Sequence, residues 1–102
     1  MIVRDHRPHA WFLLEEGGVL FLDAACTHSF LDYSVLIALD DQEIRDFETR
    51  GRAFLDQLAR EIHDSAPAAR ESRSPYKARN LTLARGDEVL EAVRLWRADQ
   101  SA

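Results

Sequence analysis

The sequence predicts a single α+β domain with an antiparallel sheet of at least three strands, one long amphipathic helix and a shorter C-terminal helix. Three observations lead to this expectation. Two apolar runs flank the glycine pair at positions 17 and 18, and apolar residues recur at helical spacing from Ile44 to Ile62. The chain also has 102 residues and 46% apolar content, which suit one modest core. We therefore expect residues 1–102 to fold as one unit.

The glycine pair joins the first two predicted strands, residues 9–16 and 19–26. Both runs are apolar, and two glycines supply the positive φ angles that a two-residue hairpin turn needs. Counting back from the turn places Leu14 opposite Phe21, and opposed residues share a face of the sheet. We therefore expect a β-hairpin in this register.

This register makes both faces of the predicted sheet apolar. One face contains Trp11, Leu13, Leu20, Leu22, Ala24 and Cys26. The other face contains Phe12, Leu14, Val19, Phe21 and Ala25. One long helix covers a single face, and a large uncovered apolar surface on a small protein marks an interface. We therefore expect a homodimer that self-associates through Phe12, Leu14 and Phe21, with the C-terminal helix as the alternative cover for that face.

A third strand and a long helix follow the hairpin. Residues 33–39 are rich in β-branched and aromatic side chains and are too short for a typical helix, so we expect a strand. Asp40 and Glu43 match a capping box at the start of an amphipathic helix of about 22 residues. Gly51 lies in its apolar stripe, and its cost of roughly 1 kcal/mol against alanine predicts close packing of the helix backbone against the sheet.

The last third of the chain predicts a loop and a final helix. Residues 65–80 have no periodicity and are long enough to count as a mobile loop. Gly86 precedes Asp87, which is a suitable cap for the last helix. The apolar face expected for that helix contains Val89, Leu90, Val93 and Trp96.

The loop holds the most basic part of an acidic chain. The net charge of −5 argues against general affinity for nucleic acid, which depends on neutralising phosphates with basic side chains. The cluster expected to bind a partner consists of Arg70, Arg73, Tyr76, Lys77 and Arg79. Basic residues around an aromatic on a mobile loop suit RNA, another single strand or an acidic protein. A solvated charged loop is the alternative.

Cys26 is the only cysteine, so no internal disulfide forms, which fits the reducing cytoplasm. The predicted register places His9 opposite Cys26, with His28 two residues beyond, and these three side chains are candidate metal ligands. The same cysteine and histidine are a candidate thiolate and base, although no third group orients the imidazole. A buried cysteine beside a hydrogen-bonded histidine is the alternative, and we expect no cofactor.

The sequence offers few other candidates for a functional site. Asp23 interrupts an apolar strand, so it lies at a solvent-facing edge, pairs with an arginine, or has a function. The sequence has no P-loop, dinucleotide-binding or calcium-loop motif. Its apolar runs are shorter than the ~20 residues of a membrane helix, and its charged N-terminus is unlike a secretory signal. We expect a cytoplasmic, non-enzymatic interaction module that does not bind membranes.

The segments Trp11–Leu14, Val19–Asp23 and Tyr33–Leu39, with the glycine turn, resemble a small family of uncharacterised bacterial proteins, and Arg79–Thr82 is similar too. This resemblance implies a variant of the Sm-like fold, a strongly bent antiparallel sheet that often forms oligomers and binds RNA. The sequence departs from the Sm pattern because its long helix follows the first three strands, and no Sm RNA-binding motif matches. We therefore transfer no functional residue from this family.

Overall fold

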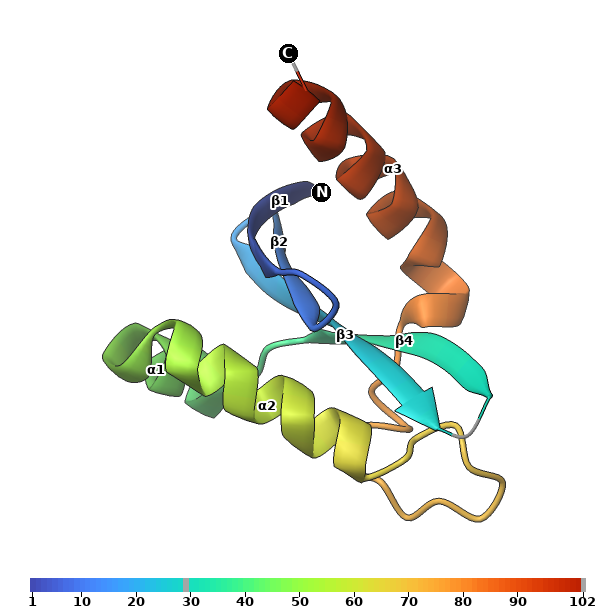
Figure 1. Ribbon diagram of the computed structural model, residues 1–102. Coiled ribbons are helices and arrows are strands. Elements are labelled where there is room, and N and C mark those ends of the chain that lie inside the picture. Colours follow the sequence, from blue (N-terminus) through green and yellow to red (C-terminus); the bar gives the residue numbers. More distant parts are fainter. Residues whose placement is uncertain (29, 102) are drawn as a thin grey trace.

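The computed structural model describes residues 1–28 and 30–101, with only the backbone described at residue 101. The described chain forms a sheet and three helices (Figure 1). The strands are β1 (Ile2–Arg7), β2 (Trp11–Glu16), β3 (Val19–His28) and β4 (Leu31–Ala38). The helices are α1 (Asp41–Arg50), α2 (Arg52–Asp64) and α3 (Thr82–Ser101). The sheet order is β1-β2-β3-β4 with antiparallel neighbours, which confirms the predicted α+β class.

The β2–β3 hairpin has the predicted register. Leu14 pairs with Phe21 and Trp11 with Ala24, and both glycines of the turn have positive φ. The third predicted strand is β4, which begins at Leu31. The structure adds β1 at the free edge of β2, where a β-bulge interrupts the pairing. The sequence of β1, Ile-Val-Arg-Asp-His-Arg, is mostly polar, so it lacks the apolar signal of a strand and is typical of an exposed edge.

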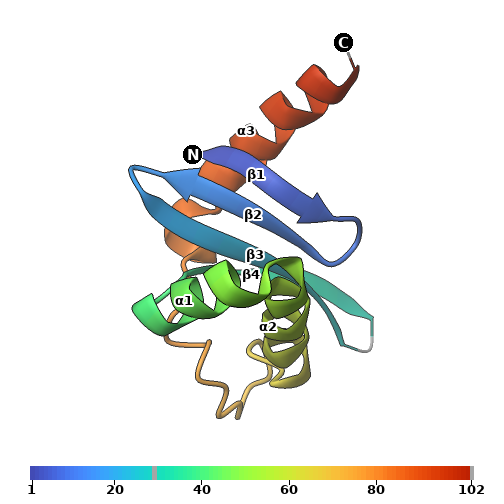
Figure 2. The ribbon, with the colours of Figure 1, turned by 90° about the vertical axis from the view of Figure 1, so that its left-hand side faces the viewer.

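Each face of the sheet packs against its own helices (Figures 1 and 2). The core under α2 contains Trp11, Leu13, Leu22, Ala24, Cys26, Val35, Ile37, Phe54, Leu55, Leu58 and Ile62. The core under α3 contains Leu14, Phe21, Leu36, Val89 and Ala92. The buried side chains divide between the two faces as the register predicts, although Val19 and Ala25 of the second set are exposed.

α3 covers the face that we expected to be open. Leu14 is 0% and Phe21 is 3% exposed beneath this helix, and the ring of Phe12 meets Trp96 at 5.7 Å between centroids. The expectation that this face lies uncovered is therefore wrong, and the alternative cover by the C-terminal helix is confirmed. Homodimer formation stays a prediction, but these three side chains no longer support it.

The predicted long helix is broken at Gly51 into α1 and α2. The capping box of Asp40 and Glu43 is present at its start. Gly51 has φ 63° and ψ −142°, a conformation that is open mainly to glycine. A Cβ atom placed there would meet no atom within 4 Å, so the predicted close packing is wrong. The glycine is needed because it adopts the positive φ angle at which α1 ends and α2 begins.

We expect Gly51→Ala to lower the free energy of unfolding by about 1.5 kcal/mol, because alanine is disfavoured at positive φ. A continuous helix would instead gain roughly 1 kcal/mol from the same change. Urea unfolding of the variant and the wild type gives the sign. Gly86→Ala is the matched control, since Gly86 lies inside α3 and its added Cβ would make an ordinary 3.5 Å contact with Thr82. If Gly51→Ala stabilised the protein, the result would contradict the interruption of the helix at Gly51.

The segment Arg79–Thr82 closes the outer edge of β4. The N–H of Leu81 donates to the Leu36 carbonyl at 2.7 Å, and the N–H of Leu36 donates to Asn80 Oδ1 at 3.2 Å. The Arg79 guanidinium donates to the Ala38 carbonyl at 2.8 Å. These bonds satisfy backbone groups that an edge strand otherwise offers to another chain.

α3 begins five residues before the predicted cap, because Gly86 is accommodated inside the helix. Val89 is buried and Val93 and Trp96 are half-buried, as the predicted face requires, whereas Leu90 is exposed. Within the described chain, no helix has both the length and the apolar character that crossing a bilayer demands.

Candidate binding surfaces

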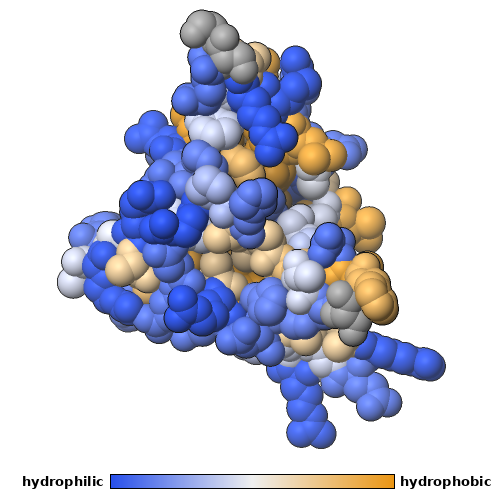
Figure 3. Space-filling view, viewed as in Figure 1, coloured by the Kyte–Doolittle hydropathy of each residue, from blue (hydrophilic) through white to orange (hydrophobic). Residues whose placement is uncertain are grey.

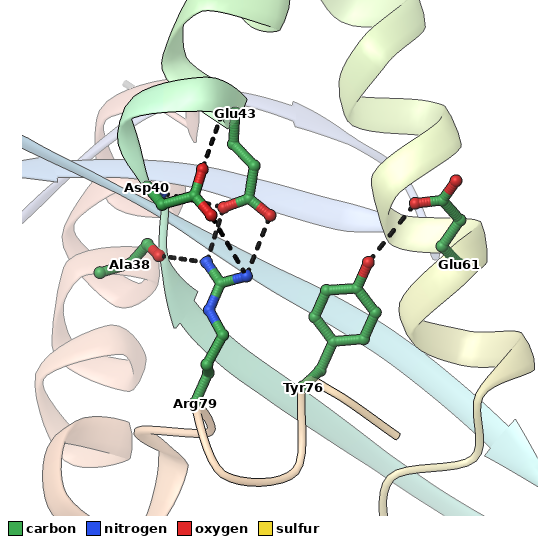
Figure 4. Close-up of polar contacts among 6 residues, drawn as sticks. All are labelled: Ala38, Asp40, Glu43, Glu61, Tyr76 and Arg79. Carbon is green, nitrogen blue, oxygen red and sulfur yellow. Dashed lines mark hydrogen bonds and ion pairs between the residues drawn. The ribbon is translucent and has the colours of Figure 1, made fainter. Parts of the chain in front are cut away.

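Arg79, one of the predicted loop residues, binds the fold instead of facing solvent (Figure 4). Its guanidinium donates to both carboxylate oxygens of Glu43, at 2.6 Å and 3.0 Å. The Asp40 carboxylate lies 3.9 Å away. Hydrogen bonding to Glu43 raises the pKa of Arg79 above its ordinary value. Arg79 therefore anchors the loop to the start of α1.

Tyr76 also points inward. Its ring packs against the core under α2, and the Arg79 guanidinium lies 5.9 Å from the ring centroid. The hydroxyl donates to Glu61 of α2 at 3.4 Å (Figure 4). Burial, with Glu61 nearby, raises the pKa of Tyr76. This ring is therefore not presented as a stacking platform for a nucleic-acid base.

The other end of the loop is held as well. Pro67 is buried, and the Ser65 and Ser74 hydroxyl oxygens lie 2.6 Å apart. The expected loop is thus present without a helix or strand, but internal hydrogen bonds fix it at several points. Hydrophilic side chains project from its outer side, at the lower right of Figure 3. The exposed basic residues of the loop are Arg70, Arg73 and Lys77.

Two surfaces of the protein carry arginine side chains that have no carboxylate partner. Six arginines form ion pairs with carboxylates: Arg4, Arg7, Arg52, Arg79, Arg85 and Arg94. Across the described residues, the guanidinium groups of Arg60, Arg70 and Arg73 have neither a hydrogen bond nor an ion pair. The Lys77 ammonium group donates only to the Ala69 carbonyl, at 3.5 Å, among the described residues. Free cations therefore mark the loop and one flank of α2.

Arg60 lines a cleft of about 450 Å³ between α2 and the turn that joins β1 to β2. α2 contributes Asp56, Ala59, Arg60 and His63, which are spaced to share one flank of the helix. The turn and the neighbouring strands contribute Arg7, His9, Ala10, Trp11 and Ala25. In Figure 3, pale apolar surface at the centre of the molecule is bordered by hydrophilic side chains on this face.

Asp56 organises one wall of this cleft. Arg7 donates to its two oxygens at 2.6 Å and 3.1 Å, and the indole N–H of Trp11 donates to it at 2.8 Å. These hydrogen bonds, with that from Arg7 the larger, lower the pKa of the Asp56 carboxyl. Asp56 therefore holds the Arg7 guanidinium in place while its own charge is compensated.

The predicted metal ligands do not come together. Cys26 pairs with Tyr33 of β4, while β2 begins at Trp11 and leaves His9 in the turn. The pairing of β2 with β3 therefore ends at Trp11 and does not extend to His9. His28 stacks on His63, with 4.5 Å between ring centroids. In the part of the chain that the structure describes, no group of three His, Cys, Asp or Glu side chains is arranged to hold a metal ion.

Cys26 is a core residue. Its side chain is 1% exposed and lies in the core under α2. Burial is the main cause that raises the pKa of its thiol. Because the thiolate is the reactive form, this environment keeps the side chain inert.

Asp23 is a desolvated carboxyl on the face covered by α3. Burial raises its pKa to about 6, and hydrogen bonding to Ser34 opposes the shift. It borders a cavity of about 250 Å³ beside α3, which Asp87 also lines, and a smaller one of about 110 Å³ near His9. Within the described chain Asp23 has no ion pair, so of the three alternatives for this residue the pairing with an arginine is not observed.

Comparison of the chain with models of known families, with curated proteins and with solved structures gives no match. The protein is therefore classified by its fold alone. It is an α+β protein whose four-stranded antiparallel sheet lies between helices. The resemblance to the Sm-like family stays a prediction.

Proposed function

We propose that this protein is a non-enzymatic interaction module that binds an acidic protein segment on the loop of residues 70–79. The observation that supports this function is the set of exposed cations Arg70, Arg73 and Lys77, which have no carboxylate partner. Tyr76 and Arg79 hold the loop against α1 and α2. A loop that is already anchored loses less conformational entropy when it binds.

An acidic protein segment suits this surface better than RNA. Single-strand binding combines cations with exposed aromatic rings, and the loop's one aromatic ring, Tyr76, packs against the core. The net charge of −5 also opposes a long polyanion. The guanidinium groups of Arg70 and Arg73 are free to bind carboxylates in the bidentate geometry that arginine favours.

Fluorescence anisotropy with a labelled glutamate-rich peptide tests this function. We expect binding that weakens as salt is added, and roughly tenfold weaker binding for Arg70→Gln/Arg73→Gln, because each lost charge contact contributes about 0.5–1 kcal/mol. Arg94→Gln is the control, since Arg94 is an exposed arginine on α3 that is paired with Glu91.

Labelled single-stranded RNA of the same charge is the competing probe. Tighter binding of RNA than of the peptide, lost in the same double variant, would favour nucleic-acid recognition by this loop. Equal peptide binding by the loop variant and the Arg94 control would overturn the proposed surface altogether.

A further inference from the structure

We infer that the cleft between α2 and the β1–β2 turn binds a small organic anion, a molecule with one carboxylate or phosphate group on a compact apolar body. This site is separate from the loop of residues 70–79. Tyr76 of the loop meets α2 at Glu61, whereas the cleft is lined by Asp56, Arg60 and His63 of the same helix.

Two guanidinium groups give the cleft its charge preference. Arg60 has no partner in the described chain, and Arg7 is held by Asp56 through Nε and Nη2, which leaves its Nη1 available. Among the described residues Asp56 is the one carboxylate that lines the cleft, and both its oxygens already accept hydrogen bonds. The cleft therefore has a net positive charge before either histidine is protonated, and a concave site focuses that field on an anion.

His9 is the second indication of a ligand. It occupies the third position of a turn in which the Ala10 N–H donates to the Arg7 carbonyl at 3.0 Å, after Pro8 at the second position. Its φ is 65°, where such turns usually have glycine. A histidine kept in a conformation that disfavours side chains, at the rim of a cleft, is typical of a functional position. Its imidazole has no partner within the described residues, so it is free to donate to an anion.

The remaining walls define the body of the ligand. Ala10, Ala25 and Ala59 line the cleft with methyl groups, which favour an apolar surface over further polar groups. The ring nitrogens of His63 lie 3.0 Å from the Thr27 carbonyl and 3.1 Å from the Asp64 carboxylate. His63 therefore lines the cleft without offering a free hydrogen-bond donor to the ligand. The volume of about 450 Å³ lies within the range of roughly 300–1,000 Å³ typical of small-molecule sites.

An NMR titration of the ¹⁵N-labelled protein tests this site with acetate, inorganic phosphate, benzoate and phenyl phosphate. We expect shifts at the amides of residues 7–11 and 56–63, and tighter binding of the two aromatic anions than of the two simple ones. The more tightly bound of benzoate and phenyl phosphate identifies the headgroup. Shifts confined to residues 70–79, or no shifts with any probe, would overturn the inference.

Arg60→Gln and Arg70→Gln form a matched pair, because each removes an exposed arginine without a partner. We expect Arg60→Gln to weaken binding of the preferred anion about tenfold, as loss of a hydrogen bond to a charged group does, and Arg70→Gln to leave it unchanged. Equal affinities for the two variants would overturn the site. Arg70 is also mutated in the peptide-binding experiment on the loop, whereas Arg60 is not. Failure of the loop proposal and failure of the cleft proposal are therefore distinguishable.

His9→Gly separates a ligand role from a structural role. Glycine relieves the backbone conformation, so we expect the thermal midpoint to rise while affinity for the anion falls severalfold. A variant that gains stability and keeps full affinity would remove His9 from the site. A variant that loses stability would show that His9 is retained for the fold, which would overturn its assigned role.

Discussion

Arg79→Met is expected to lower the free energy of unfolding by about 3 kcal/mol, the largest effect we expect from a single charged side chain. The change leaves the Glu43 side chain, which is 12% exposed, without its cationic partner. It also removes the donor to the Ala38 carbonyl and the cation over the Tyr76 ring. Breaking a buried ion pair costs roughly 3–5 kcal/mol, and the 31% exposure of Arg79 places this pair at the lower end.

Urea unfolding measures this loss, and two further variants assign its cause. Arg79→Met/Glu43→Gln is expected to recover much of the stability, because no charge is then left buried alone and the glutamine still accepts from the Asp40 N–H in the capping box. Arg94→Met breaks an exposed pair with Glu91 and is expected to cost less than about 0.5 kcal/mol. Equal losses for the Arg79 and Arg94 variants would show that the anchor contributes nothing beyond an ordinary surface pair.

Hydrogen exchange locates the consequence in the structure. The Leu81 N–H bonds to β4 beside the anchor, so its exchange is expected to speed up in Arg79→Met through local opening of the segment. Unchanged exchange at Leu81 would show that the edge of β4 stays closed without the guanidinium.

Local patterns predict the parts of this fold that depend on neighbouring residues. The glycine turn fixes the β2–β3 register, since one residue of slip would exchange the two apolar faces. The capping box at Asp40 and Glu43 is likewise a relation across three residues. The same kind of pattern fails at Gly51, because periodicity reports which side of a helix is apolar and not the φ angle of one residue.

The candidate surfaces depend on contacts between distant segments. The sequence identifies Arg70, Arg73 and Lys77 as an exposed basic cluster, yet it gives no sign that Arg79 turns inward to a glutamate 36 residues away. The cleft is less predictable still, because Arg7 and Asp56 are separated by 49 residues and meet only when β1 joins the sheet. The local pattern that bears on the cleft is the spacing of Asp56, Arg60 and His63, which places them on one flank of α2, and it does not by itself indicate a cleft.

Asp23 is a residue whose chemistry the sequence does signal, as a carboxylate inside an apolar strand. We expect Asp23→Asn to raise the free energy of unfolding by about 2 kcal/mol near neutral pH. The folded protein holds the proton up to about pH 6, while the unfolded chain releases it near pH 3.8. The difference between these two pKa values corresponds to about 3 kcal/mol, and partial solvent exposure reduces it.

The sign of the pH dependence follows from these two values. Below pH 3.8 the carboxyl is protonated in both states and has no ionisation cost. As the pH rises towards 6, the unfolded chain loses the proton first, so the wild type loses stability relative to Asp23→Asn. The other titratable and charged groups around the two cavities, Asp87, Arg7 and His9, are common to both proteins. The difference between the two stability curves therefore isolates Asp23.

Urea unfolding across this pH range measures that difference. Asp32→Asn is the control, since Asp32 is an exposed aspartate of β4 and is expected to give no gain. A gain for Asp23→Asn that stayed constant with pH would contradict a desolvated carboxyl and indicate a packing effect instead. A gain that grows between pH 3.8 and about 6 would show that the fold tolerates an ionisation cost at Asp23, a carboxyl that borders two cavities and exchanges its proton near pH 6.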